Sequence, residues 1–297
     1  MTIKRTAMVT ISGRPNVGKS TLLNALVGEK IAIVTNKPQT TRNRILAVLN
    51  KDETQFVFID TPGYHAPRTR LGDYMVKIVR ESVADVDAVI LMVEPIANIG
   101  QQEAELIKRL EANGVPSVLV INKIDTVAKE DLLKVIDLYQ AAHKFDAIVP
   151  ISARKGDGVS ELITVLEGYA LEGPQLFPDD MITDQPERQI VAEIIREKLL
   201  LCLQKEIPHG TAVEVTKFSE RESGIIDVEA TIYVEKPSHK GMVIGKNGAM
   251  LKQIGEMARK DIERFMGTKV YLETWVKVKE RWRDSAFLLR NFGYTNE

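Results

Sequence analysis

The sequence predicts an α/β protein in which a mainly parallel sheet is followed by a second, smaller α+β domain. Short apolar runs alternate with segments of helical periodicity through the first half of the chain, a pattern typical of a parallel sheet with helices on both faces. The alternation stops in a stretch rich in proline and aspartate near residue 180, and a different order of elements follows. A length of 297 residues is enough for two domains.

The first domain is predicted from its apolar runs, several of which are near-continuous in Val, Ile and Leu, as in strands that are covered on both faces. Between these runs, apolar residues recur at helical spacing. The expected strands are residues 7–12, 45–50, 56–60, 88–94, 117–122 and 147–152, and the expected helices are residues 19–27, 71–84, 101–113, 129–143 and 159–169.

The second domain is predicted to begin after residues 172–186, because the Pro, Gly and Asp content of that stretch is typical of a linker. Its elements follow the order helix, strand, strand, helix, helix, strand. An apolar stripe at residues 190–202 predicts the first helix, residues 213–218, 225–234 and 270–278 are the expected strands, and a short segment to residue 244 precedes a helix through 251–265. We expect domains at 1–172 and 187–280, a linker at 173–186, and a basic C-terminal helix and tail at 281–297.

The composition is that of a folded protein, since 44% hydrophobic and 27% charged residues exclude a largely disordered chain. The single cysteine, Cys202, excludes an intramolecular disulfide and is typical of a reducing compartment. The N-terminal residues lack the apolar region of a signal peptide, and no apolar run approaches the ~18 residues of a membrane span. We therefore expect a cytoplasmic location.

The charge is distributed unevenly along the chain. Residues 236–290 hold 13 basic and 6 acidic residues and carry a net charge of +7, whereas the rest of the chain carries −8. A basic block of this kind indicates a polyanionic partner for the C-terminal half. A solvated basic face without any partner is the alternative.

A phosphate-binding loop is predicted where the first strand meets the first helix. The sequence from Gly13 to Ser20 fits the pattern G-x-x-x-x-G-K-[ST] in the strand–loop–helix context that the motif requires. Glycines let the backbone wrap around phosphate oxygens, and the helix N-terminus adds partial positive charge. A chance glycine loop is the alternative. The residues expected to bind phosphate are Gly13, Arg14, Pro15, Asn16, Val17, Gly18, Lys19, Ser20 and Thr21.

A second motif follows the third expected strand and has the form D-x-x-G. Asp60 can hold a magnesium ion, directly or through water, and the N–H of Gly63 can contact a γ-phosphate. Taken alone, Asp-x-Pro-Gly is also an ordinary turn sequence. The residues that belong to this motif are Asp60, Thr61, Pro62, Gly63 and the adjacent Tyr64.

Two further strand ends carry residues that fit a guanine base. The carboxylate of Asp125 can accept hydrogen bonds from the N1–H and N2 amino group of guanine, a donor pair that adenine lacks. The stem of Lys123 can cover the base, Asn122 can tie its loop to the phosphate loop, and the N–H of Ala153 can reach guanine O6. The expected residues are Asn122, Lys123, Ile124, Asp125, Ser152, Ala153 and Arg154.

These four motifs in this order resemble the translation-factor-like P-loop GTPases over roughly residues 6–169. The segment Pro-Gln-Thr-Thr-Arg at 38–42 resembles switch I of the Era family of bacterial GTPases. The resemblance implies hydrolysis of GTP to GDP and phosphate with Mg²⁺ as cofactor. It implies Ser20, Thr41 and Asp60 as magnesium ligands, with Thr40 as a substitute for Thr41, and support of the transition state by Lys19 and Thr41.

Tyr64 stands where Ras-type enzymes carry their water-orienting glutamine. A phenol is a poor substitute for that amide, so we expect slow intrinsic hydrolysis and assign no general base. His65 could orient water, but a lone surface histidine usually has no such role.

The basic half contains an I-G-x-x-G loop followed by a helix. Its glycines allow a sugar–phosphate backbone to approach the main chain, as in the GXXG loop of KH domains. The element order is that of a type II KH domain, and this half also resembles the Era family. The residues expected to bind RNA are Ile244, Gly245, Lys246, Asn247, Gly248 and Lys252.

The resemblance implies binding to small-subunit (16S) ribosomal RNA near its 3′ end, in assembly of the small ribosomal subunit. It also implies peripheral association with the inner membrane, and we expect a monomer. A GTP-regulated protein–protein or membrane-surface module whose basic half binds anionic lipid is the alternative, and an RNA-binding protein with an inactive nucleotide fold is another. Further phosphate and stacking contacts are expected from Lys277, Lys279, Arg281 and Arg283 with Trp275 and Trp282, although Trp275 could instead pack on the last helix.

Overall fold

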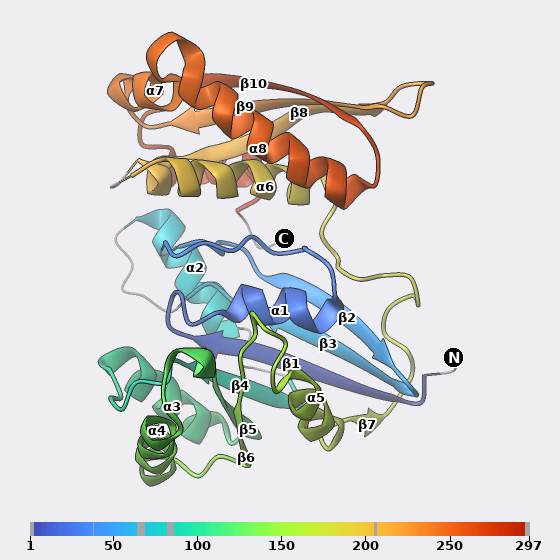
Figure 1. Cartoon of the computed structure of the whole chain (residues 1–297), viewed down its shortest axis with the longest axis vertical. Coiled ribbons are helices and arrows are strands. Elements are labelled where there is room, and N and C mark those ends of the chain that lie inside the picture. Colours follow the sequence, from blue (N-terminus) through green and yellow to red (C-terminus); the bar gives the residue numbers. More distant parts are fainter. Residues whose placement is uncertain (1–2, 38, 64–68, 82–85, 205–206, 295–297) are drawn as a thin grey trace. The chain divides into compact units, whose positions relative to one another are not determined.

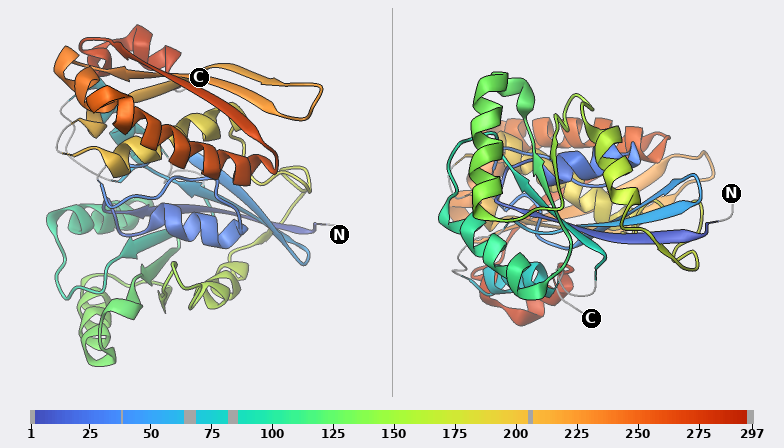
Figure 2. Two further views of the ribbon diagram at one scale, coloured as in Figure 1. Left: turned by 45° about the horizontal axis from the view of Figure 1, so that its top comes forward. Right: turned by 90° about the horizontal axis from the view of Figure 1, so that it is seen from below.

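The computed structural model describes residues 3–37, 39–63, 69–81, 86–204 and 207–294 (Figures 1 and 2). The chain forms two compact units. The first consists of residues 1–66 and 75–184, and the second of residues 67–74 and 185–297. The main division, after Asp184, falls within the stretch expected to be a linker.

The first unit is built on one seven-stranded sheet with the order β2-β3-β1-β4-β5-β6, to which β7 adds beside β1 (Figure 1). β1 and β3 to β6 run parallel, and β2 and β7 pair antiparallel to their neighbours, so the predicted mainly parallel α/β sheet is confirmed. The strands are β1 (Arg5–Gly13), β2 (Ile45–Lys51), β3 (Thr54–Asp60), β4 (Ala88–Val93), β5 (Ser117–Ile121), β6 (Ala147–Pro150) and β7 (Leu171–Glu172). The helices among them in the chain are α1 (Lys19–Val27), α2 (Arg70–Glu81), α3 (Gln101–Asn113), α4 (Lys129–Ala142) and α5 (Val159–Glu167), and the start of α2 is assigned to the second unit.

Helices cover both faces of this sheet, which explains the near-continuous apolar strands. All six residues of β4 are buried. Ile90 and Met92 pack with residues of α1 and α5, whereas Val89, Leu91 and Val93 pack with residues of α3 and α4. The two hydrophobic clusters fix the strands, and the loops at the carboxyl ends of β1, β3, β5 and β6 carry the predicted motifs.

The second unit contains a three-stranded sheet with the order β10-β9-β8, in which β9 pairs antiparallel with β8 and parallel with β10. Val228, Ala230 and Ile232 of β9 form its core with the apolar faces of α6 and α8. This is the predicted helix–strand–strand–helix–helix–strand order. The elements are α6 (Glu187–Cys202), β8 (Ala212–Glu220), β9 (Ile226–Val234), α7 (Pro237–Ile244), α8 (Ala249–Met266), β10 (Val270–Val278) and α9 (Ala286–Asn291). Among the residues described above, no helix is long and apolar enough to cross a bilayer.

The stretch expected to be a linker lies along β2 and β3 of the first unit. The side-chain oxygen of Gln55 accepts the N–H groups of Leu176 and Phe177, both at 2.9 Å. Further along, the N–H of Val48 donates to the carbonyl of Ile182 at 2.8 Å, and Thr183 Oγ1 donates to the carbonyl of Leu46 at 2.6 Å. Residues 176–183 are therefore held to the sheet edge, which composition alone does not indicate.

Trp282 does not offer the stacking surface expected of it. Its indole is fully buried, and Nε1 donates to the carbonyl of Gly210 at 2.9 Å. Phe292 packs edge-on against the indole at 5.5 Å between ring centroids. The expectation was wrong because residues beyond β10 fold back over this ring. Arg283 was expected to contact phosphate, but its guanidinium pairs with Glu235 at 2.5 Å. Trp275, the other tryptophan expected to stack, is 44% exposed.

Candidate functional site

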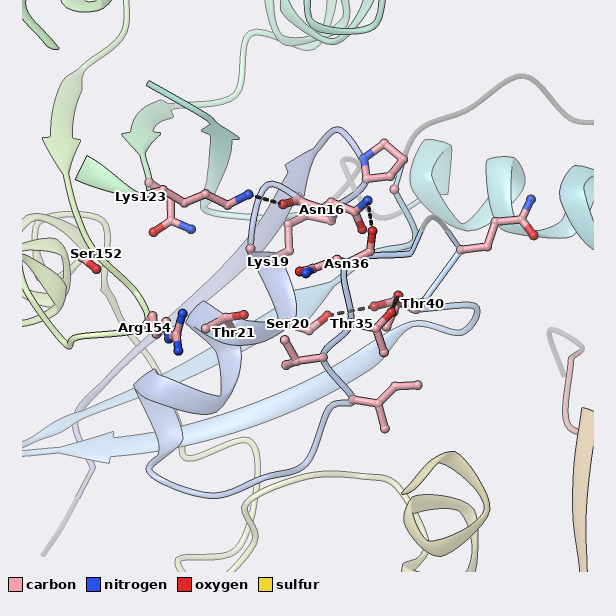
Figure 3. A pocket seen from close by; sticks show the side chains of 18 of the residues that line it. Asn16, Lys19, Ser20, Thr21, Thr35, Asn36, Thr40, Lys123, Ser152 and Arg154 are labelled. Carbon is pink, nitrogen blue, oxygen red and sulfur yellow. Dashed lines mark hydrogen bonds between the residues drawn. The ribbon is translucent and has the colours of Figure 1, made fainter. Parts of the chain in front are cut away.

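A cavity of about 430 Å³ lies at the carboxyl edge of the sheet in the first unit (Figure 3). Its walls come from the loop between β1 and α1, the segment between α1 and β2, and the loops after β3, β5 and β6. In open α/β sheets, ligands bind in the crevice at this edge. The predicted residues that line the cavity are Pro15, Asn16, Gly18, Lys19, Ser20, Thr21, Thr40, Thr41, Gly63, Asn122, Lys123, Asp125, Ser152 and Arg154.

Other predicted residues support this cavity without lining it. Thr61, for example, is buried and donates from Oγ1 to the carbonyl of Ile11 at 3.1 Å, which holds the D-x-x-G segment against β1. The predicted residues that the structure describes but that do not line the cavity are Gly13, Arg14, Val17, Asp60, Thr61, Pro62, Ile124 and Ala153. Tyr64, His65 and Pro38 lie outside the described residues.

The phosphate loop depends on glycine where it turns into α1. Gly18 has a φ of 106°, and a Cβ there would lie 2.2 Å from Nδ2 of Asn122. Gly63 approaches the same loop from β3, since a Cβ at Gly63 would lie 2.8 Å from backbone atoms of Pro15. Any side chain at either position would push apart loops that must meet around a phosphate.

Lys19 places a buried ammonium inside the phosphate loop. Its Nζ donates to the carbonyls of Gly13 at 3.2 Å and Arg14 at 3.0 Å. Burial lowers the pKa of Lys19 to about 8, although the negative charge of Asp60 acts to raise it. A partly desolvated cation beside a helix N-terminus is suited to binding phosphate oxygens.

Three oxygen-bearing side chains meet beside Lys19. Ser20 Oγ donates to Asp60 Oδ2 at 2.8 Å and lies 2.8 Å from Thr41 Oγ1, which is 3.4 Å from the same carboxylate oxygen. Thr40 points elsewhere, because its Oγ1 donates to the carbonyl of Lys37 at 2.6 Å. The structure thus brings together Ser20, Thr41 and Asp60, not Thr40.

The residues of this cluster fit a magnesium ion. Asp60 is fully buried, and its Oδ1 has no hydrogen-bond partner within the part of the chain that the structure describes. Burial raises the pKa of Asp60 to about 6, and a divalent cation beside the carboxylate would offset that effect by favouring the ionised form. Mg²⁺ prefers carboxylate, hydroxyl and phosphate oxygens, which is the donor set found here.

Asn122 joins three loops at the other end of the cavity. The side chain is buried, Nδ2 donates to the carbonyl of Val17 at 2.8 Å, and Oδ1 accepts the N–H of Ala153 at 2.9 Å. The predicted tie to the phosphate loop is therefore present. The expectation that the Ala153 N–H is directed at guanine O6 is wrong for this structure, because that N–H satisfies the buried oxygen of Asn122.

Asp125 offers an ionised carboxylate at the same end. Ser152 Oγ donates to its Oδ1 at 2.8 Å, and Lys155 Nζ lies 3.7 Å from Oδ2. The bond from Ser152, together with the nearby Lys155, lowers the pKa of Asp125. The carboxylate can therefore accept two N–H groups from one ligand edge, as guanine recognition requires.

Six residues that were not among the expected nucleotide-site residues also line the cavity. Five of them lie between α1 and β2, where Gln39 belongs to the expected switch I segment and the other four belong to no motif. Asn36 is tied to the phosphate loop, because Asn16 Nδ2 donates to its carbonyl at 2.9 Å (Figure 3). The bond uses a backbone carbonyl, so the identity of Asn36 does not predict this contact. The six residues are Ile33, Val34, Thr35, Asn36, Gln39 and Thr126.

A second candidate site lies in the other unit, at the loop between α7 and α8. Gly245 and Gly248 have φ values of 74° and 78°, and a Cβ at Gly245 would lie 2.6 Å from that of Met250. Lys246 and Asn247 between them are exposed. Next to the loop, α8 and β10 border an open groove lined by Gly248, Leu251, Lys252, Gly255, Glu256, Arg259, Leu272 and Thr274.

The α/β fold, the phosphate loop, the Ser20–Thr41–Asp60 cluster and the carboxylate of Asp125 define a P-loop GTPase. Two family models match the chain: one described as a 50S ribosome-binding GTPase at residues 8–123, and one described as a KH domain at residues 206–283. The chain is 51% identical over 290 residues to the GTPase Era of Ruminiclostridium cellulolyticum, covering 98% of this chain and 97% of that protein. It is 53% identical over 295 residues to the GTPase Era of Alkaliphilus oremlandii, covering 99% and 100%.

Solved structures agree with these relatives. A crystal structure of Era in complex with MgGDPNP and nucleotides 1506–1542 of 16S ribosomal RNA has a TM-score of 0.94 and 38% identity, covering 99% of this chain and 100% of that one. A crystal structure of a variant of Aquifex aeolicus Era bound to GDP and AlF4⁻ has a TM-score of 0.94 and 38% identity, covering 98% and 100%. The chain belongs to the Era family of GTPases.

Proposed function

We propose that the chain binds GTP, GDP and Mg²⁺ in the first unit and small-subunit (16S) ribosomal RNA near its 3′ end in the second, in assembly of the small ribosomal subunit. We assign nucleotide binding to residues 1–172 and RNA binding to residues 187–280. The observation that carries the proposal is the arrangement of the cavity, in which Lys19 and the Ser20–Thr41–Asp60 cluster lie at one end and Asp125 at the other.

Each side chain then has a defined task toward the nucleotide. The ammonium of Lys19, still mostly protonated at pH 7, binds β- and γ-phosphate oxygens. Ser20, Thr41 and Asp60 hold Mg²⁺, which when bound supplies positive charge beside those oxygens. Asp125 accepts the N1–H and N2 amino group of guanine, which selects guanine over adenine.

Hydrolysis is coupled to the two loops that contact the γ-phosphate. Thr41 belongs to the segment between α1 and β2, and Gly63 to the loop after β3, so loss of the γ-phosphate releases both loops. If this release alters the RNA site, the nucleotide state changes the RNA affinity, and bound RNA changes the nucleotide affinity by the same free energy. We assign no general base, and we expect slow hydrolysis by the isolated protein.

RNA binding is supported by the loop and groove of the second unit. Leu251 and Leu272 provide apolar surface, and Lys252 and Arg259 place positive charge beside it. Backbone phosphates can pass the glycine loop while unstacked bases occupy the groove. The related Era structure that contains nucleotides 1506–1542 of 16S ribosomal RNA supports the choice of partner. A KH-type groove favours RNA over the alternative, an anionic lipid surface.

A charge placed in the glycine loop tests the RNA site. Gly248→Asp sets a carboxylate against the phosphates, so we expect at least tenfold weaker binding of an RNA of the 16S 3′ end in an anisotropy titration. Gly224→Asp is the matched control, because Gly224 has a φ of 77° against 78° for Gly248 and neither Cβ would meet another atom within 4 Å. Equal RNA affinity of the two variants would remove the glycine loop from the proposal.

The location of the protein stays a prediction. We expect a cytoplasmic monomer with peripheral association with the inner membrane. Fractionation of cells after a high-salt wash tests the membrane association, since a peripheral contact with anionic lipid is weakened by salt. Sedimentation of the purified chain tests the monomer.

A further inference from the structure

Glu94 lies between two loops that a bound nucleotide must bridge. It directly follows β4, and its Oε1 is 2.5 Å from Nζ of Lys123 in the loop after β5. Its Oε2 is 3.8 Å from Nη2 of Arg14 in the phosphate loop. Glu94 is not among the residues that line the cavity, and no sequence motif marks it. One carboxylate therefore contacts cations from both the phosphate end and the base end of the site.

The contact with Lys123 acts on a residue whose backbone is unusual. Lys123 has a φ of 65°, in the left-handed region that residues other than glycine rarely adopt. Its ammonium also donates to the carbonyl of Asn16 at 2.8 Å (Figure 3). Because the ammonium is held by Glu94 and Asn16, the aliphatic stem of Lys123 is kept in the cavity wall. Without the carboxylate, only the Asn16 carbonyl would hold that ammonium among the contacts described.

The other cation, Arg14, is held from the side of α3. Glu103 is fully buried and accepts the N–H of Gly100 at 3.0 Å, which caps the N-terminus of this helix. The same carboxylate forms an ion pair with Nε of Arg14. A series of ionic contacts thus connects α3 to Arg14, Glu94 and Lys123. Arg14 keeps a buried partner when Glu94 is changed, whereas Lys123 loses its only ion-pair partner among the described residues.

We propose that Glu94 is a positioning residue for recognition of the guanine base, acting through Lys123; this inference rests on the nucleotide site proposed above. Glu94 holds the Lys123 stem where it covers one face of the base. Its close contact is with Lys123 at the base end, and Arg14 of the phosphate loop keeps its pair with Glu103 when Glu94 is changed, so the loss of Glu94 weakens GDP and GTP binding by the same factor. The reacting phosphate is unaffected, so the effect appears in KM and not in kcat.

A charge-removing substitution with a matched control tests the proposal. Glu94→Gln keeps the side-chain shape and removes the charge. Glu167→Gln removes the charge from the Lys51–Glu167 pair at 2.8 Å, where the side chains are 38% and 31% exposed, against 38% and 26% in the Lys123–Glu94 pair. We expect Kd for GDP and for GDPNP to rise about three- to tenfold in Glu94→Gln only, through faster dissociation. The kcat at saturating GTP and the thermal midpoint match those of the control.

A double-mutant cycle identifies the partner through which Glu94 acts. Combined with Lys123→Ala, the Glu94→Gln substitution adds nothing further to the loss of GDP affinity, whereas its effect persists when combined with Arg14→Ala. Additive effects with Lys123→Ala, or a Kd for Glu94→Gln equal to that of the control, overturn the proposal. A parent protein that fails to bind GDP would instead refute the nucleotide site itself, so the two failures are distinguishable.

Discussion

Replacement of Asp125 by asparagine reverses the hydrogen-bonding pattern that the cavity presents to a purine. In the parent protein, Ser152 Oγ donates to Oδ1 at 2.8 Å, so Oδ2 is the oxygen that lacks this donor. In Asp125→Asn, the amide oxygen keeps the bond from Ser152, and the amide nitrogen takes the place of Oδ2. We therefore expect the variant to donate where the parent accepts. The N2 amino group of guanine then meets another donor, whereas O2 of xanthine meets a partner.

The magnitude follows from the charge that is lost. The pKa of Asp125 is lowered by the bond from Ser152 and by Lys155, so the carboxylate is ionised at neutral pH. Two hydrogen bonds to an ionised group contribute about 1.5–3 kcal/mol each. Loss of one such bond, and weakening of the other to a neutral hydrogen bond, predicts an affinity for GDP lower by a factor of about 10²–10³. Binding of xanthosine diphosphate improves, because repulsion between its O2 and the carboxylate is removed.

Competition against a fluorescent GDP analogue measures both affinities in one assay. Asp157→Asn is the control, since Asp157 is exposed in the loop after β6 and its substitution changes the net charge equally. Ser152→Ala in the Asp125→Asn background frees the amide to rotate, so we expect it to reduce the preference for xanthine. The base-recognition role is wrong if Asp125→Asn prefers GDP over xanthosine diphosphate as strongly as the parent does.

Three other expectations follow from the structure. Lys19→Ala removes the buried ammonium, and we expect GTP affinity to fall by at least a hundredfold in equilibrium dialysis, since a charged hydrogen-bonding group is lost. Asp60 binds Mg²⁺ only when ionised, and its pKa is raised to about 6, so we expect the Mg²⁺ affinity of the GDP complex to fall about tenfold from pH 7 to pH 5. The pH dependence of Mg²⁺ binding to free GDP is measured in parallel and subtracted. A carboxylate with a pKa of 3.8 would give no such loss. Trp282→Ala opens a cavity and lowers the free energy of unfolding by about 3–5 kcal/mol, whereas Trp275→Ala lowers it by less than about 1 kcal/mol; equal losses in chemical denaturation would contradict the burial described.

Local signals in the sequence predict most of the fold and the ends of the cavity. β4 is recognisable because both of its faces are covered, and the phosphate loop is recognisable because Gly18 and Lys19 are required by its geometry. The remainder depends on contacts between distant segments. The N–H of Ala153 is taken by Asn122, whose buried oxygen needs a donor that the motif does not specify. Trp282 is buried by residues after the last strand, and its own neighbourhood in the sequence resembles an exposed basic segment.

Glu94 and Asn36 are residues at the nucleotide site that the sequence likewise does not predict. Neither belongs to a motif, because each acts through a partner that is distant in the sequence. Glu94 follows an apolar strand, and only the fold brings it beside Lys123. Asn36 contributes a carbonyl, which any residue could supply, so its identity carries no signal.

The attachment of residues 176–183 to β2 has a consequence for the behaviour of the protein in solution. β2 is the outermost strand on its side of the sheet, and an uncovered outer strand recruits strands from other molecules. The hydrogen bonds of Val48 to Ile182 and of Thr183 to Leu46 occupy part of the outer edge of β2. Shortening this segment would therefore expose unpaired backbone groups of β2. We expect the shortened protein to self-associate increasingly as its concentration rises, while the nucleotide cavity stays intact.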